Sequence, residues 1–404
     1  MMDDASDNRS FLPYGRQMID AADEQAVLDV LRGDWLTTGP AVEDYETNFA
    51  ERVGARHAIA CSSGTAGLHM ATMALDLDGG DIVIVPSVTF LATANAARFV
   101  KAEVLFADVD PETGVMRVED VQRAIAGMTK GTVKAILPVH LTGHTVNLDG
   151  LAAEFPELVI VEDACHALGT DYRNGGSMVP VGSCPHGGIT TFSTHPVKTI
   201  ATGEGGMLTT NSDSFADTLR RTRNHGIVRE SERFLNKSMG FEGDDPAPWY
   251  YEMHAPAYNY RLSDINAALG LSQLRKLDGF VAQRRILRAR YQEQLDALGP
   301  NVAMQKVAEG CNPAWHLAVA LIDFAALDTT RTAVMTALKK RGIGTQVHYI
   351  PVHRQPYYAN RYRPEALPGA DAYYARCLSL PLFPAMSEDD VDRVVAELAT
   401  VLGI

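Results

Sequence analysis

Short apolar runs recur along the first half of the chain and alternate with segments of helical periodicity. The runs are rich in Val, Ile and Leu and read DIVIVP, AEVLFADVD, VKAILPVHL, LVIVEDA, ITTFS and GMLTT. Helical patterns such as VEDVQRAIAGM and LDGLAAEF separate the earlier runs. Near-continuous apolar strands with helical crossovers predict a mostly parallel sheet that is covered on both faces.

Two helices and a strand are predicted ahead of these runs. Asp20 can cap a helix over 21–31, and a second helical segment covers 42–53. The strand AIAC then leads through SSGT into a helical pattern over 65–75. This turn is a possible anion site, because free N–H groups and the helix dipole converge at a helix start. Its candidate phosphate ligands are Ser62, Gly64 and Thr65, although the local sequence alone favours a plain N-cap.

The pattern changes after residue 260. The stretch LSDINAALGLSQLRKLDGFVAQRRILRARYQEQLDAL predicts one long unbroken helix that bridges two domains or lies across a subunit interface. Beyond it, WHLAVALIDF, TQVHYI and CLSLPLF read as strands and TTRTAVMTALKKR as a helix. A last helix starts at a capping-box-like SEDD segment, 387–390. We expect a large α/β domain over 1–260, with a tail at 1–12, and a small α+β domain over 261–404.

Composition and charge narrow the class of protein. The 404 residues are 46% apolar and 21% charged, which is typical of a globular protein with room for two cores. The net charge of −14 argues against a nucleic-acid surface, which needs concentrated positive charge. The nearest approach to a basic cluster is a set of four arginines on the long helix, and we interpret it as a solvated face: Arg284, Arg285, Arg288 and Arg290.

Neither a membrane segment nor a metal site is expected. The apolar runs are too short to span a bilayer and the N-terminus lacks an apolar signal region, which favours a cytoplasmic enzyme. The five cysteines are scattered and form no C-x-x-C pair. His140 and His144 lie in HLTGH, which resembles a turn after a strand and not a helical zinc-binding face.

The strongest chemical signal lies in FSTHPVKTIATGEGGMLTT. Lys198 falls on a loop between two strands, where a pocket that lowers its pKa would leave a free amine for a Schiff base. Asp163 ends the strand LVIVED, and ligands of parallel sheets gather at such strand ends. A pyridine aldehyde phosphate needs an amine, a carboxylate and a phosphate site together. Phe90 offers a flat face for its ring and His166 could orient the site. Taken singly, each residue has a more ordinary explanation: Phe90 as a core residue, Asp163 as a helix cap and His166 as a loop histidine with a satisfied hydrogen bond.

Six blocks of the sequence resemble the signature segments of the DegT/DnrJ/EryC1/StrS sugar aminotransferases. They are SSGTAGLHMA, VEDACHALG, FSTHPVKTIATGEGGMLTT, RNHGI, YNYRLSDINAALGLSQL and QVHYIPVH, in the family's order. The resemblance runs from about Tyr14 to the C-terminus and implies the fold type I (aspartate aminotransferase-like) architecture. The lysine loop and HYIPVH are most similar to the pseudaminic-acid transaminases, which aminate C4 of a UDP-4-keto-6-deoxy-hexosamine.

The resemblance also implies roles for individual residues. Lys198 matches the lysine that holds pyridoxal 5'-phosphate (PLP), and Asp163 matches the partner of its ring nitrogen. Asn259 matches an asparagine that reaches the neighbouring subunit's cofactor, which implies a homodimer with shared active sites. Phosphate contacts and the stacking ring fall on Ser62, Gly64, Thr65, Ser193 and Phe90. Substrate-facing positions fall on Tyr14, Thr37, Thr38, Gly39, Arg261, His348 and Tyr349, of which Arg261 would hold a carboxylate.

The implied function is transfer of the amino group of L-glutamate to C4 of a UDP-linked 4-keto-6-deoxy-N-acetylhexosamine, with ping-pong kinetics. Another epimer, nucleotide or C3 as the aminated carbon stays open, as does a non-catalytic PLP-binding regulator. A sugar 3-dehydratase of the same fold has His at the position of Lys198. Two features depart from the family pattern: His166 stands where some relatives have Gln, and the segment 236–254 is long and acidic.

Overall fold

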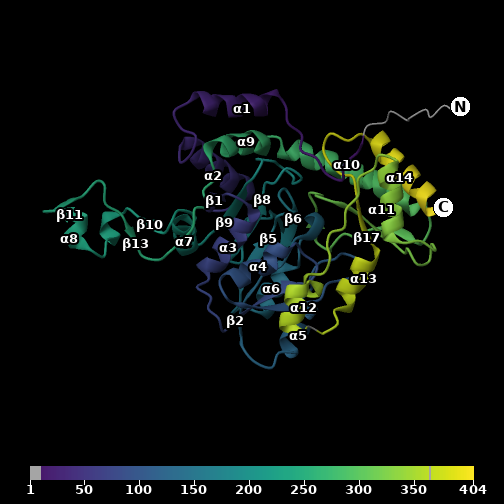
Figure 1. The fold of residues 1–404 in the computed structure, drawn as a ribbon, viewed down its shortest axis with the longest axis horizontal. Helices are drawn as coiled ribbons and strands as arrows, with labels where there is room; N and C mark the ends of the chain where they lie inside the picture. The colour runs from purple at the N-terminus through teal and green to yellow at the C-terminus, as the bar shows by residue number, and fades with distance from the viewer. Residues whose placement is uncertain (1–10, 364) are drawn as a thin grey trace.

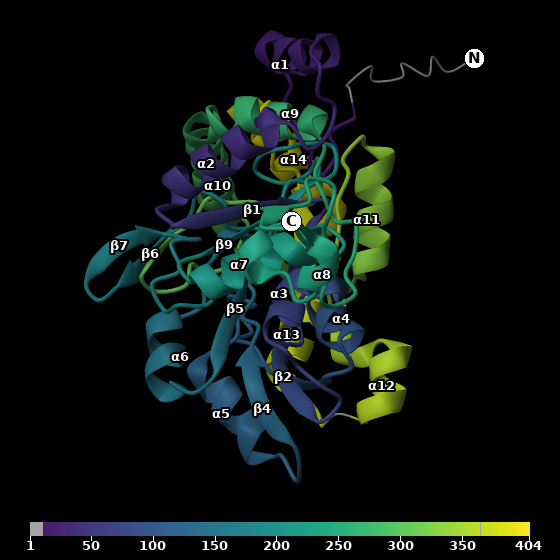
Figure 2. The same ribbon diagram turned by 90° about the vertical axis from the view of Figure 1, so that its left-hand side faces the viewer.

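The computed structural model describes residues 11–363 and 365–404, and its centre is a seven-stranded sheet (Figures 1 and 2). The strand order is β1-β9-β8-β5-β4-β2-β3. Only β9 runs antiparallel to its neighbours, and the other pairings are parallel, which confirms the mostly parallel sheet. The strands span His57–Cys61 (β1), Asp81–Pro86 (β2), Glu103–Ala107 (β3), Thr132–Ile136 (β4), Val159–Asp163 (β5), Ile189–Ser193 (β8) and Gly206–Thr210 (β9).

Helices cover both faces of this sheet, as the apolar strands predicted. Successive residues of β2 point to opposite sides, so that Ile84 belongs to one core and Val83 and Val85 to the other. One face carries α2 (Pro40–Val53), α5 (Val118–Ala126), α6 (Leu148–Glu154) and α9 (Asp264–Leu274). The other carries α3 (Gly64–Ala74), α4 (Leu91–Phe99), α7 (Asp213–Arg223) and α12 (Pro356–Tyr362). Helix α1 (Ala21–Arg32) is capped by Asp20 as expected and packs on α9.

A second core lies under the C-terminal elements. The antiparallel sheet β14-β16-β17 packs against α11 and α14 and the second half of α10. Leu12 is buried in this core and bridges Ile343, while residues 1–10 of the expected tail lie outside the described part of the chain. The domain boundary after residue 260 stays a prediction. The element bounds are Leu277–Asp296 (α10), Val302–Met304 (β14), Ala318–Ile322 (β16), Arg331–Lys340 (α11), Pro368–Arg376 (α13), Cys377–Leu380 (β17) and Glu388–Leu402 (α14).

Three expectations about the C-terminal half were wrong. The long helix is broken between α9 and α10, where Lys276 forms ion pairs with the carboxylates of Asp20 at 2.5 Å and Asp23 at 2.8 Å. TQVHYI is not a strand, because only Gln346 pairs with β17, as an isolated bridge to Ser379. Local periodicity carries no information about these contacts, which join segments far apart in the sequence.

The third error concerns the arginines of α10, two of which are buried. Arg284 donates from Nη1 to the carbonyl oxygens of Trp315 at 3.3 Å, His316 at 3.1 Å and Leu382 at 2.9 Å. Arg288 lies over the Trp315 ring and donates to the carbonyl oxygen of Gln305. Burial lowers the pKa of each guanidinium to about 10. These arginines donate hydrogen bonds to backbone carbonyl groups that are not paired in a helix or sheet. The helical pattern of the sequence does not reveal this role.

An arm over 229–256 projects from the body beside α7 (Figure 1). Within the arm, the carboxylate of Glu252 accepts hydrogen bonds from the N–H groups of Leu235 at 2.7 Å and Asn236 at 2.8 Å. The strand β10 (Ile227–Val228) leads into the arm, which contains further short elements: Ser231–Arg233 (η2), Lys237–Gly240 (α8), Phe241–Glu242 (β11), Asp245–Pro246 (β12) and Glu252–Met253 (β13). It includes the long acidic segment noted in the sequence. None of the described helices has the length and apolar character to span a membrane.

Candidate active site

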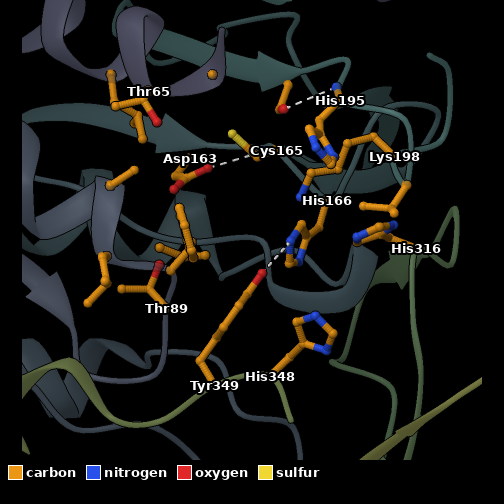
Figure 3. A pocket seen from close by; sticks show the side chains of 18 of the residues that line it. Thr65, Thr89, Asp163, Cys165, His166, His195, Lys198, His316, His348 and Tyr349 are labelled. Carbon is orange, nitrogen blue, oxygen red and sulfur yellow. Dashed lines mark hydrogen bonds between the residues drawn. The ribbon is translucent and has the colours of Figure 1, made fainter. Parts of the chain in front are cut away.

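A cavity of about 510 Å³ lies beyond the carboxyl ends of β5 and β8 (Figure 3). This is the edge of the sheet where ligands of such folds gather. The cavity brings together ten of the residues predicted from the sequence: Tyr14, Gly64, Thr65, Phe90, Asp163, His166, Ser193, Lys198, His348 and Tyr349. These residues come from segments far apart in the sequence, from Tyr14 to Tyr349, so the cavity forms only when those segments pack together.

The other six predicted residues do not line this cavity within one chain: Ser62, Thr37, Thr38, Gly39, Asn259 and Arg261. Most of them gather near the start of α9. Gly39 donates its N–H to Asp264 at 2.9 Å, and Thr37 bridges Ser263. Asn259 is exposed, and its backbone forms an isolated β-bridge with Asn224. The side chain of Asn224 accepts a hydrogen bond from Arg261.

Lys198 lies on the loop between β8 and β9, as predicted. Its backbone N–H donates to the carbonyl oxygen of His195 at 2.8 Å. The loop is fastened by a hydroxyl pair, Thr194 and Thr202, whose oxygens are 2.6 Å apart. Desolvation in the cavity lowers the pKa of Lys198, and Cys165 and Asp163 oppose part of that shift. The site therefore favours a neutral amine more than water does.

Asp163 is the last residue of β5 and is held in one orientation. The Thr93 hydroxyl donates to its Oδ2 at 2.6 Å, and the N–H of Cys165 donates to its Oδ1 at 3.2 Å. Thr93 is in turn 2.8 Å from the hydroxyl of Thr89. Because the carboxylate is buried, these donors replace the water that it has lost.

The N-terminus of α3 forms another wall of the cavity. Ser63 caps the helix, because its Oγ accepts a hydrogen bond from the N–H of Ala66 at 3.1 Å. The N–H groups of Gly64 and Thr65 are the first two of the helix and have no acceptor within it. A Cβ at Gly64 would lie 2.9 Å from the Cβ of Ser193, which explains the glycine. The structure thus places Ser63, and not the predicted Ser62, in the cavity wall.

A group of histidines and a tyrosine lines the opposite side (Figure 3). The Nε2 of His166 is 3.0 Å from the hydroxyl of Tyr349, and the rings of His166 and His316 are 4.4 Å apart. Burial lowers the pKa of His166 and His316 well below the ordinary value and lowers that of His348 to about 3. All three are therefore neutral at physiological pH.

Several lining residues were missed from the sequence: Ser63, Thr89, Cys165, His195 and His316. Cys165 and His195 stand next to predicted residues, so proximity to Asp163 and Lys198 was the available signal. His316 carried no such signal, because it lies 118 positions after Lys198 and within a stretch expected to be a strand interior.

HLTGH forms a turn after β4, as expected. Its first histidine, His140, accepts a hydrogen bond from the N–H of Val146 and lies 2.8 Å from the carboxylate of Glu162. His144 packs edge-on against Trp315. The described residues contain no group of three or more His, Cys, Asp or Glu side chains arranged to hold a metal ion.

Comparison with known proteins bears directly on this cavity. The model of the DegT/DnrJ/EryC1/StrS aminotransferase family matches residues 17–399. The chain belongs to this family. It is 38% identical over 397 residues to the spore coat polysaccharide biosynthesis protein SpsC of Bacillus subtilis, covering 97% of each chain.

Solved structures agree with this assignment. PseC of Helicobacter pylori, an aminotransferase involved in the biosynthesis of pseudoaminic acid, aligns with a TM-score of 0.85. It covers 98% of this chain and 100% of its own, and at 24% identity the likeness shows the fold alone. Spr1654 of Streptococcus pneumoniae in its PLP form aligns with a TM-score of 0.83 at 27% identity, covering 97% and 99%. The same protein was also solved in a PMP form.

The protein is therefore a PLP-dependent sugar aminotransferase with the fold type I architecture. The residues of the cavity fit the cofactor. A lysine with a lowered pKa suits an aldehyde, and the oriented carboxylate of Asp163 suits a pyridine nitrogen. The free N–H groups at the start of α3 suit a phosphate, and the bare backbone at Gly64 lets one approach closely.

Proposed function

We propose that the protein transfers the amino group of L-glutamate to C4 of a UDP-linked 4-keto-6-deoxy-N-acetylhexosamine by a ping-pong mechanism. The observation that carries the aminotransferase chemistry is the convergence of Lys198, Asp163 and the start of α3 on one cavity. The sugar rests on the form of the lysine loop and of HYIPVH, which resemble those of enzymes that aminate C4. Because one site serves both half-reactions, each substrate enters after the previous product has left.

Lys198 acts first as the amine that holds the cofactor and then as the acid and base of the reaction. PLP, when bound, supplies an aldehyde that condenses with amines and a ring that withdraws electrons. Burial lowers the pKa of Lys198, which favours the neutral amine needed for this role. With PLP bound, the neutral Nζ would accept the proton from Cα of the amino donor, and the protonated Nζ would donate it to the former aldehyde carbon of the cofactor.

The other residues bind and orient. Asp163, oriented by the Thr93 hydroxyl, would hold the ring nitrogen of bound PLP in its protonated form. The N–H groups of Gly64 and Thr65 bind the phosphate together with the Ser193 hydroxyl. Further members of the site would complete the binding: Ser63 beside the phosphate, Phe90 against the ring face, and His166 next to the ring.

Similarity to a named relative supports the substrate class. SpsC, named for spore coat polysaccharide biosynthesis, is similar to this chain over nearly its whole length. That similarity favours a nucleotide-linked keto-sugar that feeds a surface polysaccharide, and it leaves epimer, nucleotide and carbon open. Lys198 argues against the 3-dehydratase chemistry. We place the reaction in the cytoplasm, where nucleotide sugars are made.

We also propose that the active unit is a homodimer with shared sites. Asn259 is exposed, and neither it nor Arg261 lines the cavity of its own chain. In a dimer the two would instead reach the partner's cofactor phosphate and a substrate carboxylate. The 37–39 loop, fastened to the start of α9, would face the sugar nucleotide from the same side. Tyr14 and His348 would approach it from within the chain.

An absorbance experiment tests the chemistry. The purified protein with PLP is expected to show the band of lysine-bound cofactor and to lose it to the pyridoxamine band on addition of L-glutamate. A panel of UDP- and dTDP-linked 3-keto and 4-keto sugars then identifies the acceptor by restoring the first band. The Lys198→Ala variant should show neither change. A parent protein that binds PLP without responding to any amino donor would instead be a non-catalytic regulator.

A further inference from the structure

Thr142 is an unusual residue that lies behind the cavity wall, where its N–H contacts the lining residue His166. It lies in the turn η1 (Leu141–Gly143) with φ 62° and ψ 0°, a left-handed conformation that is an outlier for a β-branched residue. Its side chain is fully buried. A position of this kind persists only where the surroundings hold it, and such positions gather at functional sites.

Every polar group of Thr142 has a partner. Its hydroxyl donates to Oε1 of Gln305 at 3.0 Å, and its carbonyl oxygen accepts from the N–H of His316 at 2.9 Å. Its N–H donates to Nδ1 of His166 at 3.3 Å. Gln305 also accepts at its carbonyl oxygen from Arg288 at 2.8 Å. The turn is thus fixed from the C-terminal half of the chain, and it aims one N–H at the ring of His166.

This contact decides which nitrogen of His166 carries the proton. A neutral imidazole has one donor nitrogen and one acceptor nitrogen. Since Nδ1 accepts from Thr142, Nε2 carries the hydrogen and donates to the hydroxyl oxygen of Tyr349, which lies 3.0 Å away. His140 follows the same rule one turn earlier, with Nδ1 accepting from Val146.

The arrangement leaves the hydrogen of Tyr349 uncommitted. Its oxygen already accepts from His166, and the described residues offer its O–H no acceptor. The Tyr349 ring lines the cavity (Figure 3). Its centroid is 5.9 Å from that of the Phe90 ring. A phenol has one hydrogen to donate, so that hydrogen is free to point into the cavity.

We propose that Thr142 is a positioning residue whose N–H holds His166 in the Nε2–H tautomer, so that the Tyr349 hydroxyl donates a hydrogen bond to an oxygen of the bound substrate. The tautomer stands on geometry alone, whereas the acceptor rests on the proposed aminotransferase function. Two kinds of oxygen could accept this hydrogen bond. One is a carboxylate oxygen of the amino donor, and the other is a carbonyl or hydroxyl oxygen of the keto-sugar. Separate half-reactions distinguish these two sources.

The first experiment reads the tautomer without any turnover. Two-bond ¹H–¹⁵N correlations are recorded on protein labelled with ¹⁵N only in histidine, with and without PLP, and His166→Gln identifies the signal. We expect the Nε2–H pattern. An Nδ1–H or doubly protonated His166 would overturn the proposal even if the protein proves to be the proposed aminotransferase. Thr142→Gly keeps the N–H and suits a positive φ, so it should keep the tautomer; loss of the tautomer in this variant would also count against the proposal.

The second experiment removes the donor. Tyr349→Phe is expected to lower kcat/KM about tenfold or more in the half-reaction whose substrate accepts the bond, and to leave the other within about threefold. A loss with the amino donor identifies its carboxylate, and a loss with the sugar identifies a sugar oxygen. No loss in either, or an equal loss in both with weaker PLP binding, would refute donation to substrate. The matched control is Tyr45→Phe, which removes a buried hydroxyl that has no hydrogen-bond partner in the structure.

Discussion

Thr93 provides the sharpest test of how the cavity holds its carboxylate. Its hydroxyl has one hydrogen, which it donates to Asp163 at 2.6 Å, so the neighbouring Thr89 must donate to Thr93. Thr93→Val keeps the shape of the side chain and removes both hydrogen bonds. Asp163 would then keep one described donor, the N–H of Cys165 at 3.2 Å.

The expected cost follows from the charge and burial of the acceptor. A hydrogen bond to a charged group contributes about 1.5–3 kcal/mol, and here the acceptor is a buried carboxylate that water cannot reach to compensate. We therefore expect Thr93→Val to lower the free energy of unfolding of the apoenzyme by about 2 kcal/mol. Thr93→Ser keeps the hydroxyl and should cost about 1 kcal/mol for the lost methyl group.

The assay is a double-mutant cycle on the apoenzyme with Asp163→Asn, measured by denaturant unfolding. Replacing the carboxylate by an amide removes the charge, so the effect of Thr93→Val should shrink to about 1 kcal/mol or less in that background. An equal effect in both backgrounds would show that Thr93 contributes packing and not charge-assisted bonding. Equal losses for the Val and Ser variants would lead to the same conclusion.

Three further predictions concern acid sensitivity, the phosphate site and the dimer. Burial lowers the pKa of His144 to about 3, so stability is lost as pH falls below the unfolded-state value of about 6.5. His144→Phe should therefore lose about 2 kcal/mol less than the parent between pH 7 and pH 5 in urea unfolding, and an unchanged pH slope would contradict this. Gly64→Ala places a Cβ 2.9 Å from Ser193 and should weaken PLP binding at least about tenfold in equilibrium dialysis, whereas Gly279→Ala, whose Cβ would meet no other group within 4 Å, should not. Asn259→Ala should weaken PLP retention while sedimentation still shows a dimer; unchanged PLP affinity would count against the shared site.

The sequence by itself determined much of this protein. Apolar strand runs and helical spacing are local signals, because buried strands and amphipathic helices impose fixed periods on the chain. They predicted the sheet, its covering helices and the loop of Lys198 between β8 and β9. Asp163 was found by the same logic, since carboxyl ends of parallel strands share one edge. The six family blocks then identified the class of enzyme.

Only the tertiary structure decided which distant residues support that site. Thr93 lies 70 positions before Asp163 yet donates to it, and Gln305 lies 163 positions after Thr142 yet fixes its turn. Arg284 is buried against carbonyl groups of other segments, and Lys276 at the break before α10 pairs with carboxylates near the start of α1. Such contacts produce no periodic pattern in the sequence, because a hydrogen bond between remote residues requires only that the packed elements bring the two residues together. The sequence therefore specified the elements and the reactive groups, and packing alone selected their partners.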